Sequence, residues 1–212
     1  MASVSRSYQG DLKQYTITLP QSCDTTTQVQ LAVTSSHLKA VFEAYRSGVE
    51  LALIMEDDMK VLRWPSHGLL HTAPPDWEIL LLYMMGARAD SIYKSPPSLW
   101  VPFEPSIFSA GAYIIRRPAM QRIVDTYLPG ASQSDNMTRM DLTAVSTNWE
   151  FPLACQSERV IFSAVETYVC TDFTIVEHSG ESTLDKSHRP QHDTTATLVQ
   201  ELIKQHGFTL YF

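Results

Sequence analysis

The chain has 212 residues, a formal net charge of −7 at pH 7, and 44% hydrophobic residues. These values are typical of a globular protein with enough apolar material for a core. The acidic balance, with no basic cluster longer than Arg116-Arg117, argues against a sequence-independent nucleic-acid surface. No apolar stretch approaches the ~20 residues that span a membrane, so we expect no transmembrane segment.

The three cysteines, Cys23, Cys155 and Cys170, show no paired metal-ligand spacing. A sparse, odd set is typical of a reducing compartment. The first residues, Met1–Ser7, lack the apolar core of a signal peptide. We therefore expect a cytoplasmic protein whose cysteines are buried or incidental thiols.

Apolar periodicity predicts an α/β order, since a helix followed directly by a strand is the repeating unit of such a sheet. The continuous apolar runs Leu51–Met55 and Ile79–Met85 are typical of fully buried strands. The remaining expected strands are Ser3–Ser7, Tyr15–Leu19, Ser109–Ile115, Arg159–Phe162 and Phe173–Val176. The expected helices are His37–Ser47, Pro118–Leu128, one after the loop Pro129–Ser134 to about Val145, and Thr194–His206.

Two further segments are expected to be irregular. The stretch Asp90–Pro105 is rich in proline, serine and aromatic residues and is interpreted as a surface excursion. The polar stretch Ser179–Asp193 is long enough to be a lid that orders when a ligand binds.

The strand Leu51–Met55 ends in three consecutive acids, Glu56, Asp57 and Asp58. Like charges so close together repel one another unless something positive lies between them. Ligands bind at strand ends in open α/β sheets, and carboxylate oxygens suit Mg²⁺ or Mn²⁺, which usually complete their coordination with substrate phosphates. We interpret the acids as a metal–diphosphate site, and the alternative is an acidic turn after a core strand.

Three segments in order carry a resemblance to a known family: Ser35–Ala40, Ala52–Asp58 and Ser109–Arg116. Together they resemble the lipopolysaccharide glycosyltransferases and collagen galactosyltransferases over roughly residues 31–185. In that family a Ser-His-Leu-Lys helix precedes a strand ending in Glu-Asp-Asp, and a later Gly-Ala-Tyr-Ile-Ile strand leads into a helix. The short chain is also similar to the compact glycosyltransferases of large chlorella viruses, which would place it in the host cytoplasm.

The resemblance implies a single domain over residues 1–212 with the GT-A fold, a Rossmann-like α/β fold whose central mixed sheet is flanked by helices. It also implies a hexosyltransferase that moves a sugar from a nucleotide-diphosphate donor, a uridine diphosphate (UDP) sugar above all, to a hydroxyl of a glycan or glycoconjugate acceptor. Mn²⁺ or Mg²⁺ would take up charge on the leaving diphosphate, while a base removes the acceptor proton.

By this resemblance Asp58 is the direct metal ligand, Glu56 contacts the metal or the ribose, and Asp57 supports the loop. Gly111, in the third segment, belongs to the nucleotide-sugar site. His178 follows the last expected strand and is a candidate metal ligand, with a polar strand cap as the alternative.

Three basic residues are candidates for the donor. Lys186 and Arg189 can clamp the diphosphate when their loop closes, or they are solvated charges on that loop. Arg6 lies where the family's first strand has an Asn-Leu pair followed by several arginines, which this chain lacks.

For the catalytic base, Asp135 is the first choice and Asp141 the second, since the family has an acid near a helix start in this stretch. The alternative for Asp135 is helix capping. Trp100 and Phe103 could stack on a sugar ring or could fasten their loop to the core.

Two other function classes stay open. A metal-dependent phosphohydrolase would use the acids in a two-metal site, but it needs further acids and histidines at other strand ends. A non-catalytic sugar-nucleotide-binding domain would tolerate a degraded motif, whereas all three acids are present here.

Overall fold

The computed structural model describes residues 16–19, 28–131, 137, 139–145, 155–172, 174–177 and 189–206. The chain forms two compact units. The first unit comprises Met1–Ile54 and Ile115–Glu166, and the second comprises Met55–Ile114 and Thr167–Phe212. The chain passes between the units within strands β2 (Leu51–Met55) and β6 (Ala112–Arg116), and again between Glu166 and Thr167.

The largest sheet has five strands in the order β2-β6-β4-β8-β5. Strand β4 (Ile79–Leu81) runs parallel to β8 (Thr167–Cys170), whereas β5 (Trp100–Pro102) is antiparallel to β8. The expectation of an α/β fold with a mixed central sheet flanked by helices is therefore confirmed.

In the first unit, helix α1 (Gln28–Arg46) packs against α4 (Arg117–Tyr127) and α5 (Ser157–Phe162). These helices contact one another through apolar faces, to which α1 contributes the fully buried Leu38, Val41 and Phe42. The two short strands of this unit, β1 (Thr16–Thr18) and β7 (Arg139–Asp141), pair in parallel.

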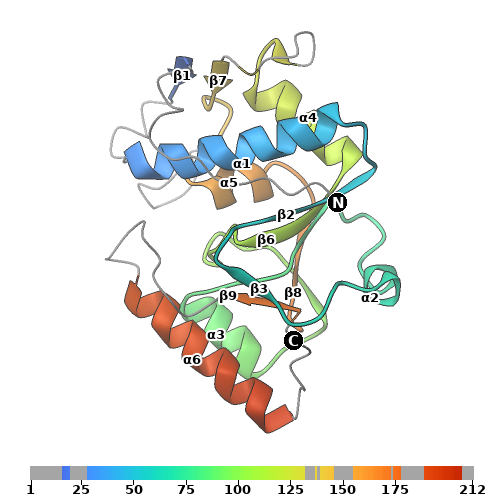
Figure 1. Ribbon diagram of the computed structural model, residues 1–212, viewed down its shortest axis with the longest axis vertical. Helices are drawn as coiled ribbons and strands as arrows, with labels where there is room; N and C mark the ends of the chain where they lie inside the picture. Colours follow the sequence, from blue (N-terminus) through green and yellow to red (C-terminus); the bar gives the residue numbers. More distant parts are fainter. Residues whose placement is uncertain are drawn as a thin grey trace. The chain divides into compact units, whose positions relative to one another are not determined.

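In the second unit, helix α6 (Arg189–His206) contacts α3 (Ala87–Lys94) and β9 (Ile175–Glu177), and Figure 1 shows α6 beside α3. Thr195 on α6 is completely buried, where it donates to Asp90 at 2.8 Å and accepts from the Gly86 N–H at 3.2 Å. A buried side chain that is satisfied on both sides fixes the position of α6 against α3.

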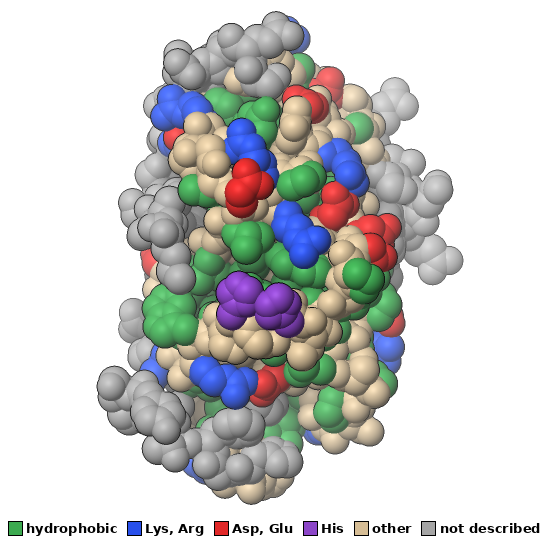
Figure 2. Space-filling model, turned by 90° about the vertical axis from the view of Figure 1, so that its right-hand side faces the viewer, with side chains coloured by type: hydrophobic (Ala, Val, Ile, Leu, Met, Phe, Trp, Pro, Cys, Tyr) green, Lys and Arg blue, Asp and Glu red, His purple; other side chains and the backbone are tan. Residues whose placement is uncertain are grey.

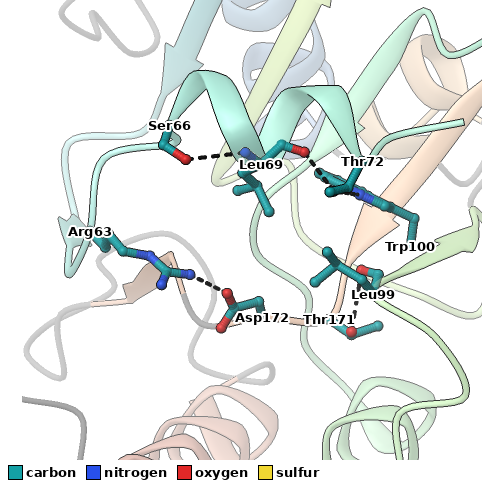
Figure 3. A network of polar contacts seen from close by, with 8 residues as sticks. All are labelled: Arg63, Ser66, Leu69, Thr72, Leu99, Trp100, Thr171 and Asp172. Carbon is teal, nitrogen blue, oxygen red and sulfur yellow. Dashed lines mark hydrogen bonds and ion pairs between the residues drawn. The ribbon is translucent and has the colours of Figure 1, made fainter. Parts of the chain in front are cut away.

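The short helix α2 (His67–His71) is fixed at both ends by side chains (Figure 3). The hydroxyl of Ser66 accepts from the Leu69 N–H at 3.1 Å, which is an ordinary N-cap. At the other end, the hydroxyl of Thr72 donates to the Leu69 carbonyl at 2.7 Å and accepts from the indole N–H of Trp100 at 2.9 Å. Trp100 is only 8% exposed, so its observed role is to fasten β5 to α2.

Two more links join the ends of strands in this region. Arg63, which follows β3 (Met59–Val61), forms an ion pair with Asp172, which follows β8 (Figure 3). Thr171 bonds to the carbonyls of Ser98 and Leu99 before β5. Side-chain contacts therefore connect the segments before and after α2 to the strands β5 and β8.

Helix α2 carries two exposed histidines one turn apart. The ring centroids of His67 and His71 are 4.6 Å apart, and Figure 2 shows a pair of adjacent histidine side chains on the surface. None of the helices in the described ranges is long and apolar enough to cross a membrane.

Several predicted elements are wrong. Arg159–Phe162, expected to be a strand, lies in helix α5, because packing against α1 overrides the strand preference of Val-Ile-Phe. The expected surface excursion Asp90–Pro105 contains most of α3 and all of β5. Residues Arg139–Asp141, expected to belong to the helix that reaches Val145, form strand β7, and strand β8 was not predicted at all.

Other predictions are confirmed or need correction in detail. Gly48 ends α1 with a positive φ of 77°, as expected, but α1 begins at Gln28 instead of His37. Leu51–Met55 is a strand, yet it is not fully buried, since Leu51 is 45% exposed. Buried and more exposed side chains alternate along this strand, because successive side chains point to opposite faces and one face is better covered.

The cysteines also differ from expectation. Cys155 is disulfide-bonded, so the prediction that all three are thiols is wrong for this residue. Cys170, in β8, is a free and fully buried thiol. Burial raises the pKa of the Cys170 thiol to about 12, so it is chemically inert at neutral pH.

Candidate functional site

The three acids form a tight turn between β2 and β3, which we call the acidic turn (Glu56–Met59). The Met59 N–H donates to the Glu56 carbonyl at 3.3 Å and closes the turn. The Glu56 N–H donates to the Gly111 carbonyl at 2.7 Å. Main-chain groups therefore hold the turn, and it presents an exposed Asp57 and a half-buried Asp58 whose Oδ1 is shielded from solvent.

Gly111 lies against the acidic turn, where an added Cβ would displace the Met59 side chain. A Cβ on Gly111 would be 2.6 Å from the Sδ of Met59. The Gly111 N–H donates to the hydroxyl of Ser109 at 3.0 Å, and Ser109 has a φ of 100°, which is uncommon outside glycine. The candidate nucleotide-sugar residue Gly111 is thus next to the acids, and its observed contribution is close packing and a backbone acceptor.

The second strand to reach the acidic turn is β9, which pairs with β3 in antiparallel register. Glu177 lies opposite Met59, the last residue of the turn. The hydroxyl of Tyr83, which is 1% exposed, donates to Oε2 of Glu177 at 3.1 Å. The register therefore brings Glu177 and the acidic turn together from segments more than a hundred residues apart.

Two buried phenols lie close to the acids. Burial raises the pKa of Tyr83 far above its ordinary value, and the negative charges of Glu177 and, more weakly, Asp58 add to this effect. Burial also raises the pKa of Tyr113, with a contribution from the charge of Glu56. Both tyrosines stay neutral, so they are hydrogen-bond donors beside carboxylates and do not compensate their charge.

Within the described ranges, no three His, Cys, Asp or Glu side chains come together in a way that could hold a metal ion. The predicted ligands Glu56 and Asp58 are described, whereas His178 lies outside these ranges. A Mg²⁺ or Mn²⁺ site built from one or two carboxylates, with substrate phosphates and waters, does not need three protein ligands. The donor chemistry of Glu56 and Asp58 fits such an ion, and the metal site stays a prediction.

Of the two candidate bases, Asp135 lies outside the described residues. Asp141 ends strand β7 in the first unit, where its Oδ1 accepts from the Thr143 N–H at 3.0 Å and from the Thr143 hydroxyl at 2.6 Å. These two hydrogen bonds hold the pKa of Asp141 below its ordinary value. The observed role of Asp141 is to close its own turn.

Of the three basic candidates, Arg189 is the one within the described residues. Arg6 and Lys186 lie outside the described residues. Arg189 begins helix α6, so the predicted loop Ser179–Asp193 is wrong over its last five residues, which are helical.

Phe103 is half-buried, and its N–H donates to the Thr167 carbonyl at 2.9 Å, which continues the pairing of β5 with β8.

Sequence reasoning missed a cavity of about 320 Å³ in the second unit, which we call the α6 cavity. It lies between α6, the β3–β9 pair and Tyr83, and most of its surface is apolar. Its lining residues are Lys60, Leu62, Tyr83, Val176, Glu177, Ala196, Val199, Gln200, Ile203 and Lys204. The amphipathic pattern of α6 indicates that one face of this helix is buried, but the pattern does not show which strands that face covers.

Comparison with family models and with curated proteins finds no match to this chain. The assignment of a function therefore depends on the chemistry of the acidic turn and its surroundings.

Proposed function

We propose that this protein is a metal-dependent glycosyltransferase that uses a nucleotide-diphosphate sugar, with a UDP-sugar as the first candidate. The observation that carries the proposal is the acidic turn, a cluster of carboxylates that main-chain hydrogen bonds hold at the end of β2. Like charges this close together repel one another, which costs free energy unless a cation lies between them. A bound divalent cation removes this cost.

In this proposal Asp58 and Glu56 hold Mn²⁺ or Mg²⁺. Asp58 is the more sheltered ligand, since its Oδ1 is shielded from solvent, whereas Asp57 is exposed and would support the turn. When bound, the ion would act as a Lewis acid on the diphosphate leaving group. Hard oxygen donors of this kind suit an ion that completes its coordination with phosphates.

The pairing of β3 with β9 supports His178 as a further ligand. Met59 lies opposite Glu177, Asp58 immediately precedes Met59, and His178 immediately follows Glu177 in the sequence. In this proposal His178, which follows β9, and Asp58, which precedes β3, would bind the same ion. Gly111 would let the main chain approach the bound nucleotide sugar, while Arg6, Lys186 and Arg189 stay predicted contacts to the donor.

The acceptor would be a hydroxyl of a glycan or glycoconjugate, and Asp135 and then Asp141 stay the predicted bases. Because Asp141 is engaged by Thr143, a role as base would require that turn to open. Asp135 is for this reason the better choice of the two.

The test separates sugar transfer from phosphate hydrolysis by the bond that breaks. The chain is incubated with Mn²⁺ and a panel of nucleotide sugars, with and without simple glycosides, and products are identified by mass spectrometry. A transferase releases a nucleoside diphosphate and forms a new glycoside. A phosphohydrolase would instead release a nucleoside monophosphate and a sugar phosphate, and that product pair would contradict the proposal.

A further inference from the structure

The α6 cavity adjoins the acidic turn but is chemically different from it. Its inner wall is formed by apolar side chains, including Val199, which is 2% exposed, and Ile203, which is 9% exposed. Gln200 and Lys204 follow these residues on α6 and are exposed, so they lie at the rim. Val199 and Ile203 are four residues apart and lie on one face of α6, and Gln200 and Lys204 form a second row beside them. The helix therefore presents an apolar row and a polar row side by side.

The polar wall of the cavity is the pair of Tyr83 and Glu177. The Tyr83 hydroxyl occupies one acceptor position of the Glu177 carboxylate and fixes its orientation. A carboxylate offers about four acceptor positions, so a fixed carboxylate of this kind can also accept from a ligand hydroxyl. The wall is rigid because Tyr83 is almost completely buried and Glu177 belongs to a paired strand.

The size and lining of the cavity restrict its ligand. About 320 Å³ lies at the lower end of the roughly 300–1,000 Å³ typical of small-molecule sites, which bury apolar surface and fix orientation with a few polar groups. Glu177 would repel a diphosphate, whereas Lys60 and Lys204 at the same cavity would attract one, so the choice of ligand depends on the shape and the apolar lining. A pyranose ring suits it, since the ring has an apolar C–H face and a rim of hydroxyl groups.

The cavity is also in the right place for an acceptor. Its Lys60 is two residues after Asp58, and its Glu177 lies opposite Met59 of the acidic turn. An acceptor must lie beside the donor sugar, which the metal–diphosphate site would hold at that turn.

We propose that the α6 cavity binds the sugar ring of a neutral glycoside acceptor, with Glu177 accepting a hydrogen bond from one of its hydroxyls. This inference rests on the proposed function, because it names the acceptor side of the same site. It assigns to α6, Tyr83 and Glu177 a binding role that the sequence did not indicate.

The experiment uses two tryptophan variants of the full chain. In Ala196→Trp the new side chain is introduced at a residue that lines the cavity, whereas in Glu201→Trp the same bulk is added at an exposed position of α6 outside the lining. Circular dichroism and thermal unfolding establish that both variants fold. Binding of a panel of p-nitrophenyl hexosides is measured by saturation-transfer NMR with UDP and the diamagnetic Mg²⁺ present, and binding of UDP with Mn²⁺ is measured separately by calorimetry.

We expect Ala196→Trp to weaken glycoside binding by at least about tenfold, and Glu201→Trp to leave it unchanged. Affinity for UDP with Mn²⁺ should be the same in both variants and in the wild type. Glu177→Gln, which keeps an acceptor for Tyr83, should weaken glycoside binding less than Ala196→Trp does.

Three results would overturn the inference. The first is glycoside binding that survives Ala196→Trp, and the second is a wild-type chain that binds UDP with Mn²⁺ but none of the glycosides. The third is a parallel loss of UDP affinity in Ala196→Trp, which would assign the cavity to the donor. A wild-type chain that binds no UDP with Mn²⁺ would instead remove the proposed function, and the calorimetric arm reports that separately.

Discussion

Two aspartates of this chain lie in turns next to short strands, and their surroundings differ. Asp141 in the first unit is half-buried, and its Oδ1 accepts two exposed hydrogen bonds from Thr143. Asp58 in the second unit is half-buried, and the turn that carries it is closed by main-chain groups of Glu56, Met59 and Gly111.

The difference lies in the groups that close each turn. In the turn of Asp141 the carboxylate itself supplies the acceptor that closes the turn, so a ligand would have to displace Thr143. In the acidic turn, hydrogen bonds between peptide groups of Glu56, Met59 and Gly111 close the turn. Residue type alone does not separate these two cases.

The largest effect is expected from filling the space beside the acidic turn. Gly111→Ala introduces a Cβ 2.6 Å from the Sδ of Met59, so the Met59 side chain must shift. We expect the free energy of unfolding to fall by about 1–3 kcal/mol, measured by urea denaturation. Repeating the substitution in a Met59→Ala background should reduce the cost, because the clashing atom is gone. An equal cost in both backgrounds would show that Met59 does not set the space available at Gly111.

A smaller effect is expected from removing the hydroxyl that bonds to Glu177. Tyr83→Phe deletes a buried hydrogen bond to a carboxylate, and we expect it to cost about 1.5 kcal/mol of unfolding free energy at neutral pH.

The same residue predicts how stability depends on alkaline pH. Burial raises the pKa of Tyr83 in the folded state, so its contribution is fully present below the unfolded value of about 10 and is lost as the pH rises above it. Denaturation curves between neutral and strongly alkaline pH should therefore show stability falling above about pH 10. The fall should be shallower in Tyr83→Phe, and an identical slope in both proteins would contradict a buried, neutral Tyr83.

The turn of Asp141 should respond in the opposite pH range. Thr143→Val removes one of the two hydrogen bonds, and because this hydrogen bond is exposed we expect a loss of only about 0.5 kcal/mol at pH 7. The pKa of Asp141 is lowered in the folded state, so this contribution is present above the unfolded value of about 3.9 and is lost as the pH falls below it. A difference between variant and wild type that does not shrink as the pH falls from about 5 to about 2 would contradict the assignment.

The smallest effect on the fold is expected at the exposed pair His67 and His71. Substitution there separates metal binding by histidine nitrogens from metal binding by the carboxylates of the acidic turn. Two imidazoles one helical turn apart can chelate Zn²⁺ or Ni²⁺ weakly, with nitrogen–metal distances of about 2.0–2.1 Å. His71→Ala should abolish Ni²⁺ binding in the absence of UDP and leave stability and Mn²⁺-dependent UDP binding unchanged. If His71→Ala lowered the Mn²⁺-dependent affinity for UDP, the acidic turn would not be the metal site.

The sequence was sufficient for features that depend on local pattern. Continuous apolar runs gave strands β2 and β4, Pro118 marked the start of α4, and the acids after Met55 marked the turn. Features that depend on contacts between distant segments were missed. Strand β8 lies between β4 and β5 because of pairing partners far along the chain, and the bond between Tyr83 and Glu177 joins residues 94 positions apart.

The central claim is that the acidic turn binds a diphosphate through a divalent cation, and calorimetry of UDP binding tests it most directly. UDP is titrated into the wild type, Asp58→Ala and the matched control Asp57→Ala, each with and without Mn²⁺. The account predicts binding that requires Mn²⁺, an affinity at least about tenfold weaker in Asp58→Ala, and a much smaller change in Asp57→Ala, whose carboxylate is exposed. Equal affinity in Asp58→Ala and the wild type, or UDP binding that does not depend on Mn²⁺, would contradict it.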